Sequence, residues 1–156
     1  MKLPFQIDLT GKVVVVTGAG GVICSVLAEA MAMTGAKVAL LDLNEDAAKK
    51  HADDITAKGY IAKGYKCNVL EKASVQAARD QIAADFGTCD ILINGAGGNN
   101  PKATTDDEYF VPEDLGQMKT FFDLDADGVS FVFSLNFMGT LIPTQVFALR
   151  SEEHTS

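Results

Sequence analysis

The chain has 156 residues, of which 47% are hydrophobic and 22% charged, and its formal net charge is −8. This length can bury one compact core, and the composition excludes a disordered or collagen-like chain. The acidic balance argues against a nucleic-acid partner and against binding to a membrane surface. Only His51 and His154 are histidines, so we expect no metal site built on histidine.

The N-terminal part alternates between apolar runs and glycine-rich breaks. The run from Val13 to Val16 is continuously β-branched, which predicts a strand buried on both faces of a sheet. The glycine-rich segment 17–21 follows, and Gly35 marks the end of the next helix. The helical spacing predicts that this helix packs on the sheet through one apolar face, formed by Val22, Ile23, Val26, Leu27, Ala30 and Met31.

The same alternation continues along the chain. Further strands are predicted over 37–41, 60–67 and 91–93, and further helices over 45–58, 71–86 and 129–149. Asn44 is placed to cap the second helix, and an acidic insertion reaches to about residue 127. Such alternation predicts an α/β fold: a doubly wound parallel sheet, Rossmann-like, truncated after the fourth strand and the following helix.

The three cysteines are an odd number and form no C-x-x-C pair. Cys24, Cys67 and Cys89 lie in apolar segments, which predicts buried, reduced thiols and a reducing compartment. The segment MKLPFQIDLTGK contains no long apolar run, which argues against a signal peptide. We therefore expect a cytoplasmic protein.

Three polar or glycine-rich clusters follow predicted strands, at 17–21, at Asp42 and at 94–98. In parallel sheets such ends meet at one edge, where ligands bind. Gly18, Gly20 and Gly21 leave room for a pyrophosphate at a helix N-terminus. These positions predict nucleotide binding.

Two polar residues extend this site. Asp42 is placed to accept hydrogen bonds from ribose hydroxyls, and its charge favours NAD over NADP; a capping or solvated aspartate is the alternative. Asn68 is placed to bind an adenine edge, or is an ordinary asparagine in a turn.

Several motifs occur together: L-T-G-K-V-V-V-V-T-G at 9–18, N-G-A-G at 94–97, and Asn136 within S-L-N-F-M-G. With these motifs the chain resembles the N-terminal part of a short-chain dehydrogenase/reductase. The resemblance implies a set of cofactor-binding residues: Thr17, Gly18, Gly20, Gly21, Val22, Ile23, Asp42, Asn68, Val69, Asn94, Ala96 and Gly97.

The sequence departs from that family's pattern at three positions. The family's glycine loop is T-G-x-x-x-G-x-G, and Val22 and Cys24 occupy its last two glycine positions here. Gly95 stands where the family usually has the second asparagine of N-N-A-G. The changes at Val22 and Cys24 bear on the geometry of the pyrophosphate site.

The resemblance implies reduction of a ketone with a tyrosine as the acid, in a Tyr-x-x-x-Lys motif. Tyr60, Tyr65 and Tyr109 are followed four residues later by glycine, valine and glutamate, so the sequence contains no such motif. The chain alone is therefore expected to be inactive. Asn136 is implied to be the catalytic residue that anchors a water of the proton relay; the alternative is a buried, satisfied polar group.

A closer resemblance points to sugar-acid reductases of the D-mannonate oxidoreductase (fructuronate reductase) type. It rests on the long insertion and on four motifs: T-G-A-G-G-V at 17–22, L-L-D-L-N at 40–44, N-G-A-G-G-N-N-P-K-A-T-T at 94–105 and N-F-M-G-T-L-I-P-T-Q-V-F at 136–147. It implies a small-molecule substrate, a sugar acid, and a homo-oligomeric parent protein. Asn99, Asn100 and Lys102 are candidates for substrate binding, against the alternative of solvated loop residues.

The heptad R-S-E-E-H-T-S at 150–156 follows an apolar segment abruptly. It matches the translation of a common sequencing-library adapter, and an ordinary polar tail is the alternative. We therefore expect an incomplete dinucleotide-binding domain over 1–149, with the natural protein continuing beyond it.

The sequence is also compatible with other functions. A non-catalytic dinucleotide-binding module and a methyltransferase-type nucleotide fold are the main alternatives.

Asp123, Asp125 and Asp127 imitate half of an EF-hand, but a serine stands where the bidentate glutamate belongs, so no calcium site is expected. The uncharged segment 128–149 is long enough to span a bilayer, yet its polar residues argue against a membrane span.

Overall fold

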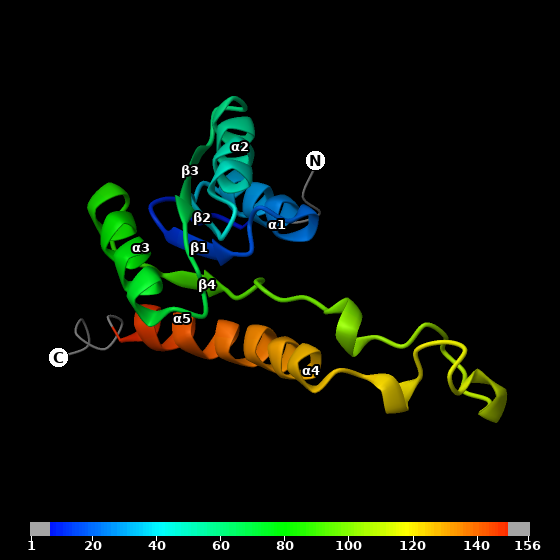
Figure 1. Ribbon diagram of the computed structural model, residues 1–156. Coiled ribbons are helices and arrows are strands. Elements are labelled where there is room, and N and C mark those ends of the chain that lie inside the picture. Colours follow the sequence, from blue (N-terminus) through cyan, green and yellow to red (C-terminus); the bar gives the residue numbers. More distant parts are fainter. Residues whose placement is uncertain (1–6, 150–156) are drawn as a thin grey trace.

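A computed structural model describes residues 7–149 of the protein (Figure 1). Four parallel strands form one sheet in the order β3-β2-β1-β4. The strands are β1 (Val13–Thr17), β2 (Lys37–Asp42), β3 (Ile61–Lys66) and β4 (Ile91–Ile93). Val16 pairs with Leu40 of β2 on one side and with Ile93 of β4 on the other. The predicted α/β fold with a parallel sheet is confirmed.

Helices cover both faces of this sheet (Figure 1). They are α1 (Val22–Met33), α2 (Glu45–Thr56), α3 (Lys72–Asp85), α4 (Ala126–Phe133) and α5 (Gly139–Ala148). Val14 and Val16 belong to the buried cluster under α1 and α2, whereas Val13 and Val15 belong to the cluster under α3 and α5. Because alternate strand residues point to opposite faces, one β-branched run supplies both cores.

Helix α1 packs on the sheet through a different face from the one that the apolar spacing predicts. Its buried residues are Cys24, Ala28 and Ala32. The predicted face is instead exposed or only partly buried: Val22, Ile23, Val26, Leu27, Ala30 and Met31. Short side chains let the helix approach the β-branched strands closely and at native packing density, which longer ones would prevent. The prediction was wrong because it weighed hydrophobicity without side-chain size.

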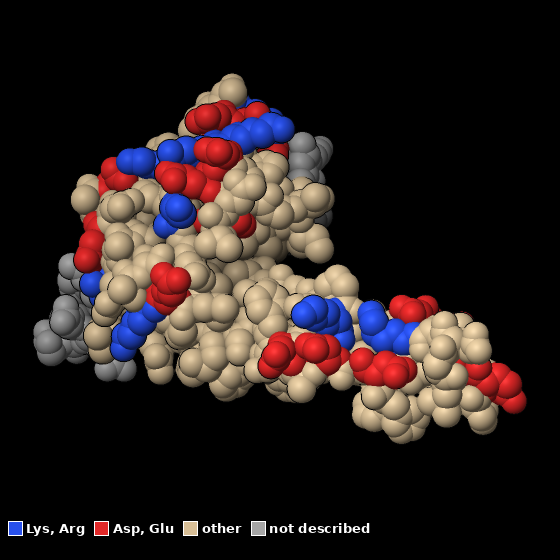
Figure 2. Space-filling view, in the orientation of Figure 1, with Lys and Arg blue, Asp and Glu red and all other residues tan. Residues whose placement is uncertain are grey.

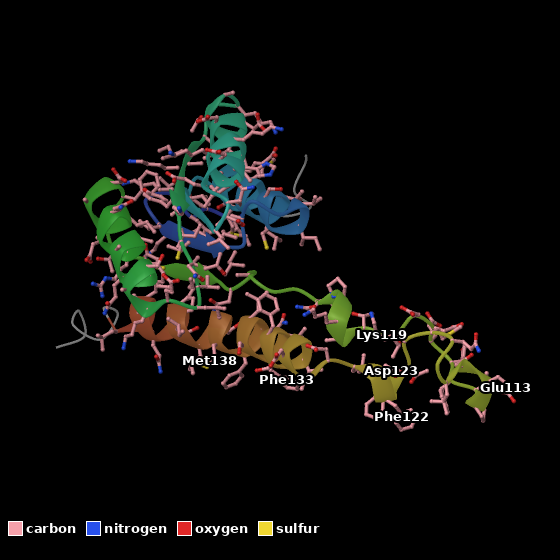
Figure 3. All side chains as sticks on the ribbon, viewed as in Figure 1. Glu113, Lys119, Phe122, Asp123, Phe133 and Met138 are labelled. Atoms are coloured by element: carbon pink, nitrogen blue, oxygen red, sulfur yellow. The ribbon has the colours of Figure 1, made fainter. Side chains whose placement is uncertain are left out.

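The segment between β4 and α4 forms an arm, defined here as residues 99–125. It contains three 3-10 turns, η1 (Pro101–Ala103), η2 (Pro112–Asp114) and η3 (Phe121–Asp123), and extends away from the sheet (Figure 1). Its base is closed by a hydrogen bond of 3.0 Å from the N–H of Asp125 to the carbonyl oxygen of Lys102. Phe122, about midway along the arm in Figure 3, is 70% exposed.

Helices α4 and α5 are joined through a π-helical turn, η4 (Ser134–Met138), into one long helix. By length and composition this helix, Ala126–Ala148, is the one described segment that meets the criteria for crossing a membrane. Core helices of soluble proteins meet the same criteria, and α5 buries Val146 and Phe147 against the core that includes α3. The expectation of no membrane span stays a prediction.

Candidate functional site

A cleft of about 800 Å³ opens at the carboxyl ends of the strands. Its walls come from the loop after β1, the start of α1, the ends of β2 and β3, the loop after β4, and the helix formed by α4 and η4. The predicted site residues that line it are Gly18, Gly20, Gly21, Val22, Ile23, Asp42, Asn68, Val69, Ala96 and Gly97. In Figure 2 the hollow between the sheet half and the arm is largely free of charged side chains.

The glycine loop lies directly against the loop after β4. Gly18 has a φ of +68°, which favours glycine, and a Cβ atom there would lie 2.8 Å from the backbone N of Ala96. Behind it, the buried Thr17 accepts hydrogen bonds of 3.1 Å from the N–H groups of Gly95 and Ala96. Thr17 does not line the cleft. Its hydrogen bonds instead join the end of β1 to the loop after β4.

The N-terminus of α1 borders the cleft and is uncapped. Gly21 occupies the cap position and provides no side-chain capping hydrogen bond, and the first turn holds no acidic residue. The first N–H groups of a helix have no acceptor within it and carry partial positive charge. The start of α1, at Val22 and Ile23, therefore offers donors suited to a phosphate group.

Asp42 stands between the two loops that frame one end of the cleft. Its Oδ2 accepts a hydrogen bond of 2.9 Å from the N–H of Gly20, and its Oδ1 one of 2.8 Å from the N–H of Asn44. A Cβ atom on Gly20 would lie 2.8 Å from the Asp42 Cγ, so only glycine permits this contact without movement. Each carboxylate oxygen keeps a further lone pair that can accept from a hydroxyl group.

Asn68 and Val69 line the cleft beyond the end of β3. The Asn68 Oδ1 accepts from the N–H of Leu70 at 3.1 Å, and its Nδ2 donates to Glu71 Oε1 at 2.9 Å. These bonds are those of an asparagine in a turn. Contact with an adenine edge stays a prediction.

Asn94 points away from the cleft. Its Nδ2 donates to the Thr144 hydroxyl of α5 at 3.0 Å, while its Oδ1 is buried and has no hydrogen-bond partner among the described residues. The structure therefore separates Asn94 from Ala96 and Gly97, which do line the cleft.

Asn136 lies in η4, and its side chain holds the loop after β4. Its Nδ2 donates to the carbonyl oxygens of Gly98 and Val132, both at 2.8 Å, and its Oδ1 accepts from the N–H of Gly98 at 3.2 Å. The amide is thus engaged on both of its ends. A part in a proton relay stays a prediction, and positioning of this loop is what the contacts show.

The three candidate substrate residues lie on the arm and do not line this cleft. Asn99 bonds to Thr104 through its Nδ2 at 2.8 Å, and the Asn100 Oδ1 caps η1 by accepting from the N–H of Lys102 at 2.9 Å. Their amides are therefore used in local turns of the arm.

The acidic residues near α4 serve as caps. Asp125 accepts from the N–H of Gly128 at 2.7 Å, and Asp123 accepts from the backbone N–H of Thr120 at 2.9 Å. Within residues 7–149, no three His, Cys, Asp or Glu side chains are grouped in a way that would hold a metal ion.

Two thiols also line the cleft. Cys24 and Cys67 are buried, and Cys89, away from the cleft, is half-buried. Burial raises the pKa of the Cys67 thiol to about 11 and also raises the pKa of the Cys24 thiol. All three are free, and the two at the cleft are neutral near pH 7.

Sequence reasoning missed part of the wall. Phe131 and Leu135 reach the cleft from α4 and η4, after the whole arm has intervened. No local pattern marks them, because only the return path of the chain brings this helix to the site. Gly95 and Cys24 also line the cleft, and their departures from the family pattern were the one available signal.

Comparisons with known proteins agree with this geometry. A family model described as short chain dehydrogenase matches residues 12–153. An uncharacterized oxidoreductase of Haemophilus influenzae is 55% identical over 148 residues, which cover 95% of this chain and 52% of the relative. A D-threitol dehydrogenase of Mycolicibacterium smegmatis is 42% identical over 97 residues, or 62% of this chain and 37% of the relative. The chain thus spans about half the length of the Haemophilus influenzae relative.

Solved structures show the same arrangement. A candidate D-mannonate oxidoreductase from Haemophilus influenzae with bound NAD superposes with a TM-score of 0.89 at 57% identity, over 92% of this chain and 51% of that one. An NAD⁺-bound xylitol dehydrogenase superposes with a TM-score of 0.74 at 30% identity, over 91% and 48%. With the family model covering nearly every described residue and the glycine loop in its expected place, the chain belongs to the short-chain dehydrogenase family.

Proposed function

We propose that this chain forms the NAD-binding part of an oxidoreductase that interconverts a keto sugar acid and its hydroxy acid, of the fructuronate/mannonate type. The observation that carries the proposal is one cleft with the uncapped start of α1 in one wall and the Asp42 carboxylate in another. The first suits a pyrophosphate and the second suits ribose hydroxyls.

The residues present fit a dinucleotide. The close packing of Gly18 and Gly20 leaves no side chain between the loop and a bound phosphate, while the N–H groups of Val22 and Ile23 would hold it. Asp42 would hold the adenosine ribose, with Asn68 and Val69 on the adenine side. Ala96 and Gly97 would border the nicotinamide half. When bound, NAD supplies the hydride acceptor or donor.

Asp42 also supports a preference for NAD. Its carboxylate is fixed by two backbone N–H groups, so it cannot swing aside without losing both hydrogen bonds. A 2′-phosphate on the ribose would meet this negative charge. We expect NADP to bind more weakly for that reason.

The substrate class is supported by similarity to the structure described as a D-mannonate oxidoreductase. No tyrosine lines the described cleft. Tyr65 donates to Asp85 Oδ2 at 2.9 Å, and burial together with this carboxylate raises its pKa, which is the wrong direction for an acid working near pH 7. We propose that the chain alone binds NAD without turning over substrate.

The parent protein is proposed to be a homo-oligomer. Phe133 and Phe137 on α4 and η4 are 71% and 65% exposed, and Figure 3 shows Phe133 and Met138 on the side of this helix away from the sheet. Exposed apolar groups gathered in this way favour association. A cytoplasmic location is proposed from the free thiols.

The direct test measures NAD and NADP binding by calorimetry, and then NADH formation from D-mannonate with the intact parent protein. We expect NAD to bind at least about 10-fold more tightly than NADP, a difference that Asp42→Asn should largely abolish. Binding without oxidation of any sugar acid would leave a dinucleotide-binding module. Failure of NAD to bind at all would overturn the proposal.

A further inference from the structure

Cys24 and Gly95 meet where α1 passes the loop after β4. A Cβ atom built on Gly95 would lie 2.2 Å from the Cys24 Sγ, far inside any contact that real atoms make. The same thiol is 3.7 Å from the carbonyl oxygen of Gly95 and is oriented to donate to it. The sulfur therefore occupies the space that a side chain at 95 would need.

Gly95 is held on its other sides as well. Its N–H donates to the Thr17 hydroxyl at 3.1 Å, and the Thr17 carbonyl oxygen would lie 2.9 Å from an added Cβ. Cys24 is 8% exposed and sits on the stripe by which α1 packs on the sheet. Neither residue has room to move without shifting the start of α1 or the loop after β4.

We infer that Cys24 and Gly95 are one complementary pair of positioning residues, which sets how closely the start of α1 approaches the loop after β4 across the cofactor cleft. Gly95 lacks the side chain that the family pattern has at this position, and Cys24 carries a thiol where the pattern has glycine. The two departures from the family pattern therefore compensate each other. Both residues line the cleft, and the first N–H groups of α1 lie one or two residues from Cys24. A shift at this contact therefore moves the donors proposed to hold the pyrophosphate.

The cofactor part of this inference rests on the proposed function, and the packing part does not. The test compares the intact protein with three variants: Gly95→Ala, Cys24→Ala and the double variant. Unfolding temperatures are measured without cofactor, and NAD dissociation constants are measured at a temperature where all four proteins are folded. This design reports packing and positioning separately.

Gly95→Ala should overpack the contact, lowering the unfolding temperature by about 5–10 °C and weakening NAD binding by about 10-fold. Removing the sulfur in the double variant leaves the new Cβ 3.6 Å from the Cys24 Cβ, an ordinary contact. We expect the double variant to recover at least about half of the lost temperature and to bind NAD within about 3-fold of the wild type, because directly contacting residues are strongly non-additive. The Thr17 carbonyl oxygen accounts for what is not recovered.

Cys89→Ala combined with Gly95→Ala is the matched control, since Cys89 lies before β4 and bonds to Ile91 rather than to Gly95. In this control the decreases in unfolding temperature of the two single variants should add. Additive losses in the Cys24 double variant, or a double variant that fails to fold, would overturn the pairing. Unchanged NAD affinity in Gly95→Ala would leave a packing contact with no positioning role. If wild-type protein binds no NAD, the proposed function fails, while the unfolding data still decide the pairing.

Discussion

Helices α1 and α2 both begin at the carboxyl edge of the sheet and border the same cleft, yet their first turns are built in opposite ways. In α2, Asn44 accepts from the N–H of Ala47 at 3.2 Å, and Glu45 and Asp46 place negative charge in the first turn. In α1, Gly21 provides no cap, and the first turn has no acidic residue. One helix satisfies its own free donors, and the other leaves them for a ligand.

Asp42 connects the two starts, because its oxygens bond to Gly20 before α1 and to Asn44 before α2. A single carboxylate thus fixes the loop that carries the free donors relative to the helix that needs none. A missing cap typically lowers folding stability by about 1 kcal/mol, and it is missing at α1, where the cofactor is proposed to bind. Comparing variants at the two helix starts therefore shows how much stability α1 gives up so that its N–H groups can bind a ligand.

The largest effect is expected from Gly18→Ala, which attacks the loop before α1. The new Cβ would meet backbone atoms of Gly95 and Ala96 at 2.8 Å, on top of the strain of a φ of +68°. We expect the free energy of unfolding to fall by about 2–4 kcal/mol and NAD affinity to fall by about 100-fold, as seen by chemical denaturation and calorimetry.

Gly59→Ala, after α2, separates the two causes. Gly59 has a φ of +88°, but an added Cβ would meet nothing within 4 Å. Its loss in unfolding free energy should be limited to about 1 kcal/mol from the backbone conformation. Equal losses at the two glycines would show that the contact with the loop after β4 is unimportant.

An intermediate effect is expected when α1 is given a side-chain cap, which α2 has and α1 lacks. Gly21→Asp adds an acceptor and a negative charge, which should offset part of the strain from a Cβ 3.3 Å from the Gly18 carbonyl oxygen. NAD affinity should nevertheless fall by about 10-fold, because the charge opposes a pyrophosphate.

Two variants sharpen this result. Gly21→Ala introduces the same Cβ without the charge and should weaken NAD binding much less. Asn44→Ala removes the cap of α2 and should cost about 1 kcal/mol of unfolding free energy. Tighter NAD binding in Gly21→Asp would contradict the assignment of the α1 start as an anion site.

The alternation of elements and the cleft-forming ends at Gly18 and Asp42 could be predicted from sequence, because their causes are local. A β-branched run reports burial on two faces, and a glycine cluster after it reports a turn. The different roles of Thr17 and Asn94 could not be predicted from local sequence. Both lie in family motifs, but only tertiary packing shows that one joins loops and the other bonds to α5.

The position of the candidate substrate residues could not be predicted from sequence either. The arm carries Asn99, Asn100 and Lys102 away from the cleft, since its course depends on its own turns rather than on any periodic pattern. The heptad at 150–156 lies outside the described residues, so its interpretation stays a prediction.

The smallest effect concerns the apolar side chains of the two helices. Ile23 of α1 is 76% exposed and lines the cleft, whereas Ile55 of α2 is 2% exposed in the core. The same change, isoleucine to valine, removes one methylene from each. In Ile55→Val it should cost about 1 kcal/mol of unfolding free energy, because a buried cavity is left.

In Ile23→Val the unfolding free energy should change by less than about 0.3 kcal/mol, since exposed atoms lose little on truncation. NAD affinity should weaken by no more than about 2-fold, through lost contact with the cofactor. Chemical denaturation of both variants with and without NAD makes the comparison. A cost at Ile23 equal to that at Ile55 would mean that the exposed face of α1 is covered in the folded protein, and that hydrophobic spacing had located a real interface.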